Sequence, residues 1–182
     1  MKSVLISIQP RWCELIASGE KTVEVRKTKP KIETPFKCYI YETQGRTETP
    51  FVDEEGHEIF KGRGQVIGEF VCDKIITAEC GNYGSLPRRE TKLDIFDLFD
   101  YADEKTVYGW HISDLVIYDN PRSVIGFYHY CGDDPKCDGC EAHYYSNTEC
   151  GKEDYCCSPL DGCKPLKRPP QSWCYVEEVC EE

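Results

Sequence analysis

Short runs of apolar residues, several of them alternating with polar ones, recur along this chain and constrain its fold more than any other feature. A period of two residues places successive side chains on opposite faces of a strand. Gly, Pro, Asn and Asp separate many of the runs, as expected of turns. The runs predict strands at 3–8, 21–27, 38–41, 65–73, 107–118 and 172–177.

Two further segments have the spacing of amphipathic helices. In 12–18 the apolar residues follow a helical period, and Gly19 stands where a helix C-cap is expected. In 93–101 the residues Leu93, Phe96 and Phe99 share one face. Many short strands with one or two helices are typical of a small, partly closed β-barrel, so we expect a mainly β fold of the α+β class.

The chain length of 182 residues suits one domain with an insertion. After residue 130 the content of Gly, Asp, Cys and Pro rises sharply, and strand-like sequence returns only near the end. We therefore expect one barrel domain built from 1–128 and 165–182. A loop-rich, cysteine-rich insertion at 129–164 interrupts it.

Charge and hydropathy restrict the location and the partners. No apolar stretch approaches the roughly 20 residues that span a bilayer, and the first apolar run is too short for a signal peptide, so we expect a cytoplasmic protein without a membrane partner. The net charge of −11 argues against broad, non-specific binding to nucleic acid. Segment 20–37 is an exception, because six bases face three acids there, whereas eight acids face two bases in 129–163. Any anionic ligand is expected to dock near 20–37.

Segment 19–27 places alternating charges directly after the first predicted helix. On a period-2 strand Glu24 and Arg26 share one face, and Lys21 falls on the other. Such a strand can line a cleft with both a cation and a carboxylate. The same pattern also suits an edge strand whose charges face water and discourage aggregation.

A Gly-x-Lys-x-x-Glu-x-Arg core starts at Gly19 and directly follows the first predicted helix. Together with the segments 7–12, 16–27, 68–70, 108–115 and 169–176, it resembles the ASCH domain family of the PUA-like superfamily. The likeness covers nearly the whole chain outside the insertion. The resemblance implies a PUA-like barrel whose cleft, beside the helix and the Lys-Glu-Arg strand, receives RNA or a nucleobase-like ligand.

The resemblance also raises the question of catalysis. Some small ASCH proteins hydrolyse the acyl amide of acetylated cytidine with a Lys and a Thr three residues apart on this strand and a more distant Glu. Lys21 matches that lysine, but Glu24 occupies the threonine position, and no motif locates the distant Glu. A hydroxyl can serve as an activated nucleophile, whereas a carboxylate beside Lys21 more readily forms a salt bridge. Because a glutamate can also act as a general base for water, Lys21 and Glu24 are the expected catalytic pair if the protein is an enzyme.

For binding, Lys21 and Arg26 are expected to contact phosphate or a base carbonyl, with the guanidinium acting as a bidentate fork. Glu24 accepts from an exocyclic amine or orients Arg26. Tryptophans offer stacking platforms worth roughly 1–3 kcal/mol per base, although in small barrels they are usually core residues. His111 is a candidate for either cleft or surface. The predicted ligand-binding residues are Arg11, Trp12, Lys21, Glu24, Arg26, Lys27, Trp110, Gln171, Ser172 and Trp173.

Seven of the thirteen cysteines fall between 131 and 163. Cys137 and Cys140 have the Cys-x2-Cys spacing with which two thiolates hold one tetrahedral zinc. The segment has little apolar content, so one zinc ion per chain is expected to supply its folding free energy, about 10–16 kcal/mol in small zinc peptides. Disulfides and an iron–sulfur cluster are the alternatives. The preferred ligands are Cys137, Cys140, Cys150 and Cys163, and Cys131, Cys156, Cys157, His129 and His143 are further candidates.

Three functions follow from these patterns. The favoured one is a binding module that recognises RNA or a modified nucleobase in a cleft around Lys21, Glu24 and Arg26. The alternatives are a nucleoside amidohydrolase of the N4-acylcytidine type and a protein-interaction adaptor that works through the acidic, cysteine-rich insertion.

Overall fold

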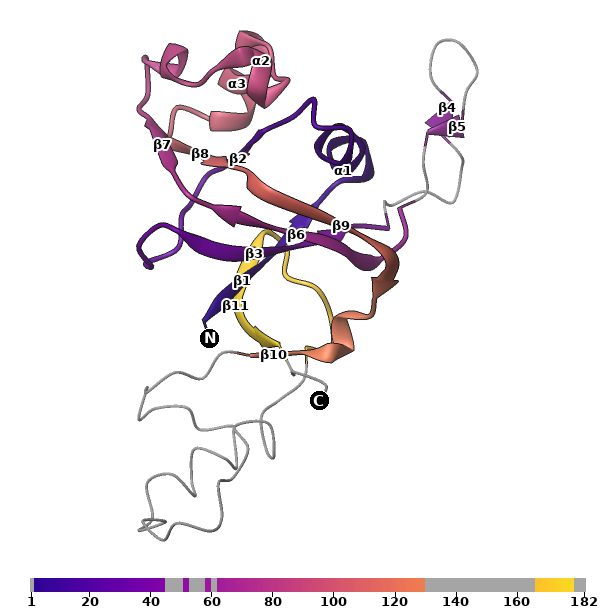
Figure 1. Ribbon diagram of the computed structural model, residues 1–182. Coiled ribbons are helices and arrows are strands. Elements are labelled where there is room, and N and C mark those ends of the chain that lie inside the picture. Colours follow the sequence, from indigo (N-terminus) through magenta and orange to yellow (C-terminus); the bar gives the residue numbers. More distant parts are fainter. Residues whose placement is uncertain (1, 45–50, 53–57, 60–61, 130–165, 179–182) are drawn as a thin grey trace, which may run out of the picture.

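The computed structural model describes residues 2–44, 51–52, 58–59, 62–129 and 166–178. These residues form a six-stranded mixed sheet, a three-stranded sheet and a two-stranded hairpin, together with a few short helices (Figure 1). The predicted class, mainly β with few helices, is confirmed.

The elements follow one another along the chain in short segments. The strands are β1 (Ser3–Ile8), β2 (Val23–Arg26), β3 (Phe36–Glu42), β4 (Phe51–Val52), β5 (Glu58–Ile59), β6 (Gln65–Cys72), β7 (Ile75–Ala78), β8 (Val107–His111), β9 (Ser113–Arg122), β10 (Phe127–His129) and β11 (Trp173–Glu178). The helices are α1 (Pro10–Ala17), α2 (Arg88–Thr91) and α3 (Ile95–Ala102), with 3-10 turns at η1 (Tyr83–Ser85) and η2 (Val124–Gly126).

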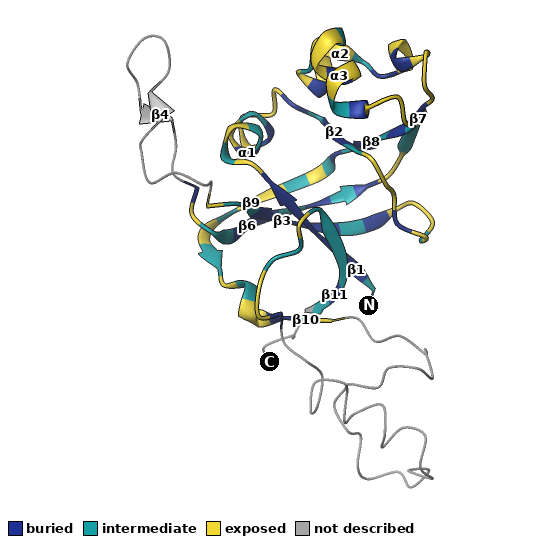
Figure 2. Ribbon diagram, turned by 180° about the vertical axis from the view of Figure 1, so that it is seen from behind, coloured by how far each residue is buried: buried dark blue, intermediate teal, exposed yellow. Residues whose placement is uncertain are grey.

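The six-stranded sheet has the order β10-β11-β1-β3-β6-β9 and apolar side chains on both faces. Every residue of β1 is buried, as the dark blue ribbon in Figure 2 shows. Alternate residues of this strand belong to different cores: Ile6 packs with Ile40 and Trp110, whereas Leu5 packs with Phe127. Because β1 is covered on both sides, its apolar run is nearly continuous instead of strictly alternating.

The three-stranded sheet has the order β2-β8-β7. Its strand β2 contains Glu24 and Arg26, two of the predicted site residues. Val25 and Val107 form a third core with residues of η1 and α3, such as Leu98. At Gly109 the packing is close, because an added Cβ would lie 2.6 Å from the Leu86 side chain. The helices α2 and α3 are thereby held against the sheet that contains β2.

The predicted run at 107–118 divides into two strands that belong to different sheets. Ile112 lies between β8 and β9, its amide donates to the Thr22 carbonyl, and Asp114 takes a positive φ of 46°. This break lets one continuous segment serve both sheets. In the described part of the chain β9 and β10 are the two edges of the six-stranded sheet and do not pair with each other. The described strands therefore form an open mixed sheet with smaller sheets and do not close into a barrel.

The C-terminal strand β11 lies between β10 and β1, so residues at both ends of the predicted domain share one sheet (Figure 1). Its register pairs Ile6 with Trp173. The insertion predicted at 129–164 lies almost wholly outside the described residues, and its boundaries stay a prediction. No helix in the described ranges is long and apolar enough to cross a membrane.

Candidate functional site

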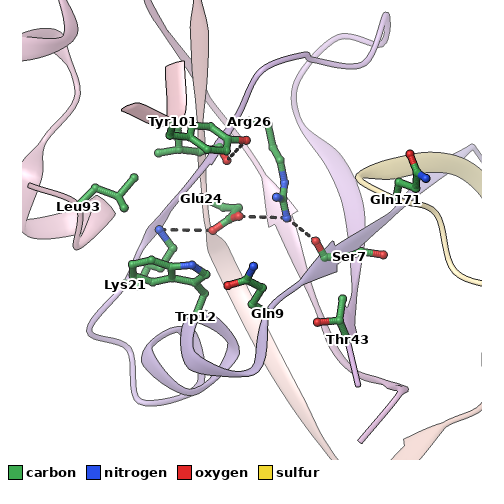
Figure 3. Close-up of a pocket in the computed structure, with 11 residues that line it drawn as sticks. Ser7, Gln9, Trp12, Lys21, Glu24, Arg26, Thr43, Leu93, Tyr101 and Gln171 are labelled. Atoms are coloured by element: carbon green, nitrogen blue, oxygen red, sulfur yellow. Dashed lines mark hydrogen bonds and ion pairs between the residues drawn. The ribbon is translucent and has the colours of Figure 1, made fainter. Parts of the chain in front are cut away.

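A cavity of about 450 Å³ opens beside α1 and β2. Its walls come from the end of β1, the start of α1, β2, the chain after β3, α3 with the segment before it, and the segment that leads into β11 (Figure 3). The lining residues are Ser7, Gln9, Trp12, Lys21, Glu24, Val25, Arg26, Thr43, Leu93, Tyr101 and Gln171. Of the ten predicted ligand-binding residues, five therefore meet in one pocket.

The turn between α1 and β2 sets the position of Lys21. The helix begins with Pro10, whose missing N–H costs nothing at that position, and it ends before Gly19, which takes the left-handed φ of 77°. The Lys21 amide then donates to the Leu15 carbonyl at 2.8 Å. Because β2 begins only at Val23, Lys21 lies in this turn and does not follow the strand's alternation.

The prediction that Lys21 and Glu24 lie on opposite faces was therefore wrong, and the two side chains meet. Lys21 Nζ lies 3.3 Å from Glu24 Oε2, and Arg26 Nη2 lies 3.0 Å from Glu24 Oε1. Figure 3 shows the carboxylate held between the two cations. The side chains of Lys21 and Glu24 are only 2% and 5% exposed. The alternative interpretation, in which the charges of this segment face water, is therefore excluded for Lys21 and Glu24.

Three acceptors surround the Lys21 ammonium. Besides Glu24, it donates to the Val23 carbonyl at 2.8 Å and to the Thr91 carbonyl at 2.6 Å. An ammonium has three hydrogens, so these contacts account for all of them. Burial lowers the pKa of Lys21, and the neighbouring Glu24 opposes that effect. Lys21 therefore fastens α2 to β2 as well as orienting Glu24.

Arg26 reaches from the end of β2 across the pocket to β1. Its Nη2 donates to the Ser7 carbonyl at 2.6 Å in addition to contacting Glu24. Its Nε is buried and has no hydrogen-bond partner among the described residues. Both of its contacts thus use one nitrogen of a group that has five N–H donors. A small movement of the side chain would offer the remaining donors to a ligand.

Aromatic rings with cations near them stand in the pocket wall. Trp12 lines the pocket from α1, and the charged ends of Lys21 and Arg11 lie 5.0 Å and 4.8 Å from its ring centroid. Tyr101 lines it from α3, with Lys27 Nζ 5.2 Å from its ring centroid. These distances are in the range of cation–π attraction. Arg11 and Lys27 are exposed and border the pocket instead of lining it.

The residues predicted from the C-terminal segment separate into three positions. Gln171 lines the pocket. Ser172 supports the pocket through its backbone, because its carbonyl accepts from the Ser7 amide at 2.8 Å. Trp173 packs against Trp110 with ring centroids 5.9 Å apart, and its Nε1 donates to Thr28 Oγ1 at 2.9 Å.

Trp110 is a core residue. Its side chain is 0% exposed, and its ring also makes an edge contact with Phe36. No described residue accepts from its Nε1. A ligand in the pocket therefore does not reach Trp110 in this conformation, which corrects its predicted place in the cleft.

His111 lies on the surface, at the end of β8, where its Nδ1 is 2.6 Å from Asp73 Oδ1. Of the two positions considered for it, cleft and surface, it occupies the surface. The hydrogen bond from His111 lowers the pKa of Asp73. This pair is outside the pocket lining.

Six lining residues were absent from the predicted set: Ser7, Gln9, Val25, Thr43, Leu93 and Tyr101. Ser7 and Gln9 belong to a segment that resembles the ASCH family, and that likeness was a usable signal. Leu93 and Tyr101 come from the segment before α3 and from α3 itself, which follow β2 by some seventy residues, and only the tertiary fold brings them to the pocket. Sequence spacing carries no signal for Thr43.

The predicted zinc ligands lie outside the described residues, except for His129, an exposed residue at the end of β10. Within the described ranges, no group of three or more His, Cys, Asp or Glu side chains is arranged to hold a metal ion. Cys13, Cys38 and Cys72, three of the cysteines outside the cluster, are buried as small core residues. The zinc site stays a prediction.

Comparisons with known proteins identify the fold. No protein-family model matches the chain, and no curated protein matches it. The ASCH protein from Zymomonas mobilis has a similar crystal structure, with a TM-score of 0.55 and 19% identity over 96% of this chain and 87% of that one. A tyrosine-to-phenylalanine variant of that protein gives 0.56 and 19%, over 97% and 91%. Its serine-to-alanine variant gives 0.55 and 19%, over 96% and 88%. The chain therefore has the fold of an ASCH domain.

Proposed function

We propose that the pocket binds an unpaired nucleobase or nucleoside, including a chemically modified one. The observation that carries this proposal is the buried chain Lys21–Glu24–Arg26 in the wall of a pocket that also presents Trp12. Buried charges are costly, and an ion pair of this kind is often no more stabilising than apolar residues of the same volume. Burial lowers the pKa of Lys21, and ionisable groups with shifted pKa values in a cleft are typical of functional sites.

The size and chemistry of the cavity suit such a ligand. Its volume of about 450 Å³ falls in the usual range of roughly 300–1,000 Å³ for small-molecule pockets. The amides of Gln9 and Gln171 can both donate to and accept from the edge of a base. The spare donors of Arg26 suit a carbonyl oxygen or a ring nitrogen, and Trp12 offers an aromatic surface.

Equilibrium binding tests the proposal. Wild-type protein is titrated with a panel of nucleosides and N4-acylated cytidines in a calorimeter, and Arg26→Lys is compared with Arg89→Lys. Arg26→Lys keeps the charge beside Glu24 but removes the fork, so we expect affinity to fall at least tenfold, about 1.4 kcal/mol. Arg89 is exposed on α2, and its variant should bind as the wild type does. Equal affinity of all three proteins would remove Arg26 and this pocket from the proposal.

The amidohydrolase alternative is decided in the same samples. Chromatography of the N4-acylated cytidines after incubation at high protein concentration shows whether the amide is cleaved. In the described conformation the hydrogens of Lys21 are engaged by three acceptors, so a proton-transfer role would require Lys21 to leave one of them. Turnover that is lost in Lys21→Met would favour the enzyme.

We also propose, from the sequence pattern alone, that 129–164 holds a structural zinc ion and that the protein works in the cytoplasm. An adaptor role for this acidic segment is the remaining alternative. Replacing 131–163 with a short linker tests it, provided that thermal unfolding of the shortened protein remains cooperative.

A further inference from the structure

A row of exposed lysines begins at the mouth of the pocket. Lys27, Lys29 and Lys31 occupy alternate positions in the loop that joins β2 to β3, and all three are exposed. Lys27 lies over the ring of Tyr101, which lines the pocket. We call Lys27, Lys29 and Lys31 the lysine track.

Aromatic side chains from three other elements accompany the track. Lys29 Nζ lies 5.3 Å from the ring centroid of Tyr108, the residue of β8 that pairs with Arg26. The Lys31 amide donates to the hydroxyl of Tyr175 on β11 at 2.6 Å. Tyr108 and Tyr175 are both partly exposed. Aromatic and basic side chains thus alternate away from the pocket.

Hydrogen bonds hold the loop against β11, so the track is not a freely moving tail. Thr28 Oγ1 accepts from Trp173 Nε1 at 2.9 Å, in addition to the contact between the Lys31 amide and Tyr175. Trp173 in turn packs on the core residue Trp110. The lysines therefore have fixed anchor points at both ends of the track.

The charge of the track contrasts with that of the whole chain. Net charge is −11 overall, whereas the track and Arg26 place four cations in succession beside three acids. Those acids are Glu24, which is paired with Arg26, Glu33, in the same loop, and Asp103, whose pKa is lowered first by Lys105 and then also by Lys27. A narrow basic path of this kind can follow one phosphate backbone, although the protein as a whole is acidic.

We propose that the base in the pocket belongs to a single strand of nucleic acid whose phosphates follow the lysine track. This inference rests on the proposed function and deepens it, because it assigns the pocket to a polynucleotide instead of a free nucleoside. A positively charged path interleaved with aromatic rings is the usual means of holding single strands. A base in a duplex is stacked and paired, and it would have to leave the helix to enter the pocket.

Fluorescence anisotropy tests the proposal with labelled RNA and DNA strands of about ten nucleotides, within the usual site size of a small binding domain. The variant is Lys27→Gln/Lys29→Gln/Lys31→Gln. The control is Lys74→Gln/Lys167→Gln/Arg168→Gln, which removes the same charge at three other exposed basic residues. Each phosphate contact contributes about 0.7 to the salt dependence of single-strand binding, so the slope of log affinity against log salt should fall by about 2 in the track variant. The control should keep the wild-type slope.

Calorimetry with the nucleoside that binds best distinguishes a failure of this inference from a failure of the proposed function. If the track variant binds that nucleoside as wild type does but binds strands at least tenfold more weakly, the inference holds. If both variants lose strand affinity equally, or if wild type prefers a hairpin duplex, the inference is overturned while the pocket's function stands. If wild type binds neither nucleosides nor strands, the proposed function fails as well. The ratio of RNA to DNA affinity shows whether the 2′-hydroxyl is read.

Discussion

Glu24→Gln is the substitution that most sharply tests the buried charge arrangement. The glutamine has nearly the shape of the glutamate, but it is neutral and has only one acceptor oxygen. It can therefore serve either Lys21 or Arg26, and its NH₂ group turns a donor toward the other cation. Because Lys21 is 2% exposed and Arg26 14% exposed, water cannot fully replace the lost carboxylate.

The expected cost follows from this geometry. Removing one partner of a buried ion pair typically costs about 3–5 kcal/mol. The lower end applies here, about 3 kcal/mol, because Lys21 keeps two carbonyl acceptors and Arg26 keeps the Ser7 carbonyl. For a chain of this size the melting temperature falls by roughly 2–4 °C per kcal/mol, so we expect a decrease of about 6–12 °C at neutral pH.

The loss should depend on pH in a defined direction. Burial lowers the pKa of Lys21, and Glu24 is the chief group that raises it, so the pKa falls further in Glu24→Gln. When the folded pKa lies below the unfolded one, the unfolded chain binds more protons between the two values, and stability rises with pH in that window. The deficit of the variant should therefore shrink as pH rises toward the ordinary lysine pKa of about 10.4.

Glu20→Gln provides a matched control. Glu20 Oε2 lies 3.3 Å from Lys92 Nζ, the same separation as in the Lys21–Glu24 pair, but the two side chains are 57% and 33% exposed. Exposed pairs contribute roughly 0–1 kcal/mol. Thermal denaturation followed by circular dichroism compares the variants at several pH values. The reasoning would be refuted if the Glu24→Gln variant were as stable as the Glu20→Gln variant. It would also be refuted if the loss of stability in Glu24→Gln did not change with pH.

Three further predictions concern other parts of the molecule. Burial raises the pKa of Cys72 to about 12, so iodoacetamide should modify exposed Cys80 in the native protein and leave Cys72 intact, as peptide mass mapping will show; equal labelling would contradict the burial. His111→Ala should raise the pKa of Asp73, because the hydrogen bond from His111 lowers it. The stability that this pair contributes is lost as pH falls through the pKa of Asp73 in the folded protein. An unchanged titration of the Asp73 carboxyl by NMR would disprove the contact. Elemental analysis of protein purified under reducing conditions should find about one zinc per chain, with thiols of 129–164 released by a chelator, and metal-free protein with few free thiols would favour disulfides.

Much of the fold could be predicted from the sequence because most strands are short and have turn residues at their ends. The predicted strand 3–8 is β1, and Gly19 has the positive φ expected after a helix. The predicted end of the run at residue 118 was wrong, since β9 continues through Pro121 to Arg122. Proline is tolerated there because β9 is an edge strand, where a missing N–H breaks no ladder. The position of a strand within its sheet is not visible in local sequence.

The candidate site was predictable only in part, for a related reason. The residue types of Lys21, Glu24 and Arg26 indicated a charged cleft, but their contacts depend on where β2 begins. Because Lys21 lies in the turn before β2, the alternation of the strand does not set its direction. The opposite wall, with Tyr101, comes from a distant helix. Trp110 shows the converse case, because a tryptophan in a family-like segment is equally compatible with core and ligand contact until the packing is known.

The most direct test of the central claim, that the pocket around Glu24 receives a nucleobase, is a two-dimensional NMR titration of isotope-labelled protein. The side-chain resonances to follow are the Trp12 Nε1–H and the Arg26 Nε–H, which has no protein partner among the described residues. We predict that one nucleoside of the panel shifts both signals saturably and in parallel, while the Trp110 signal from the core moves least. Saturable shifts that spare Trp12 and Arg26 and occur elsewhere on the protein would contradict the account.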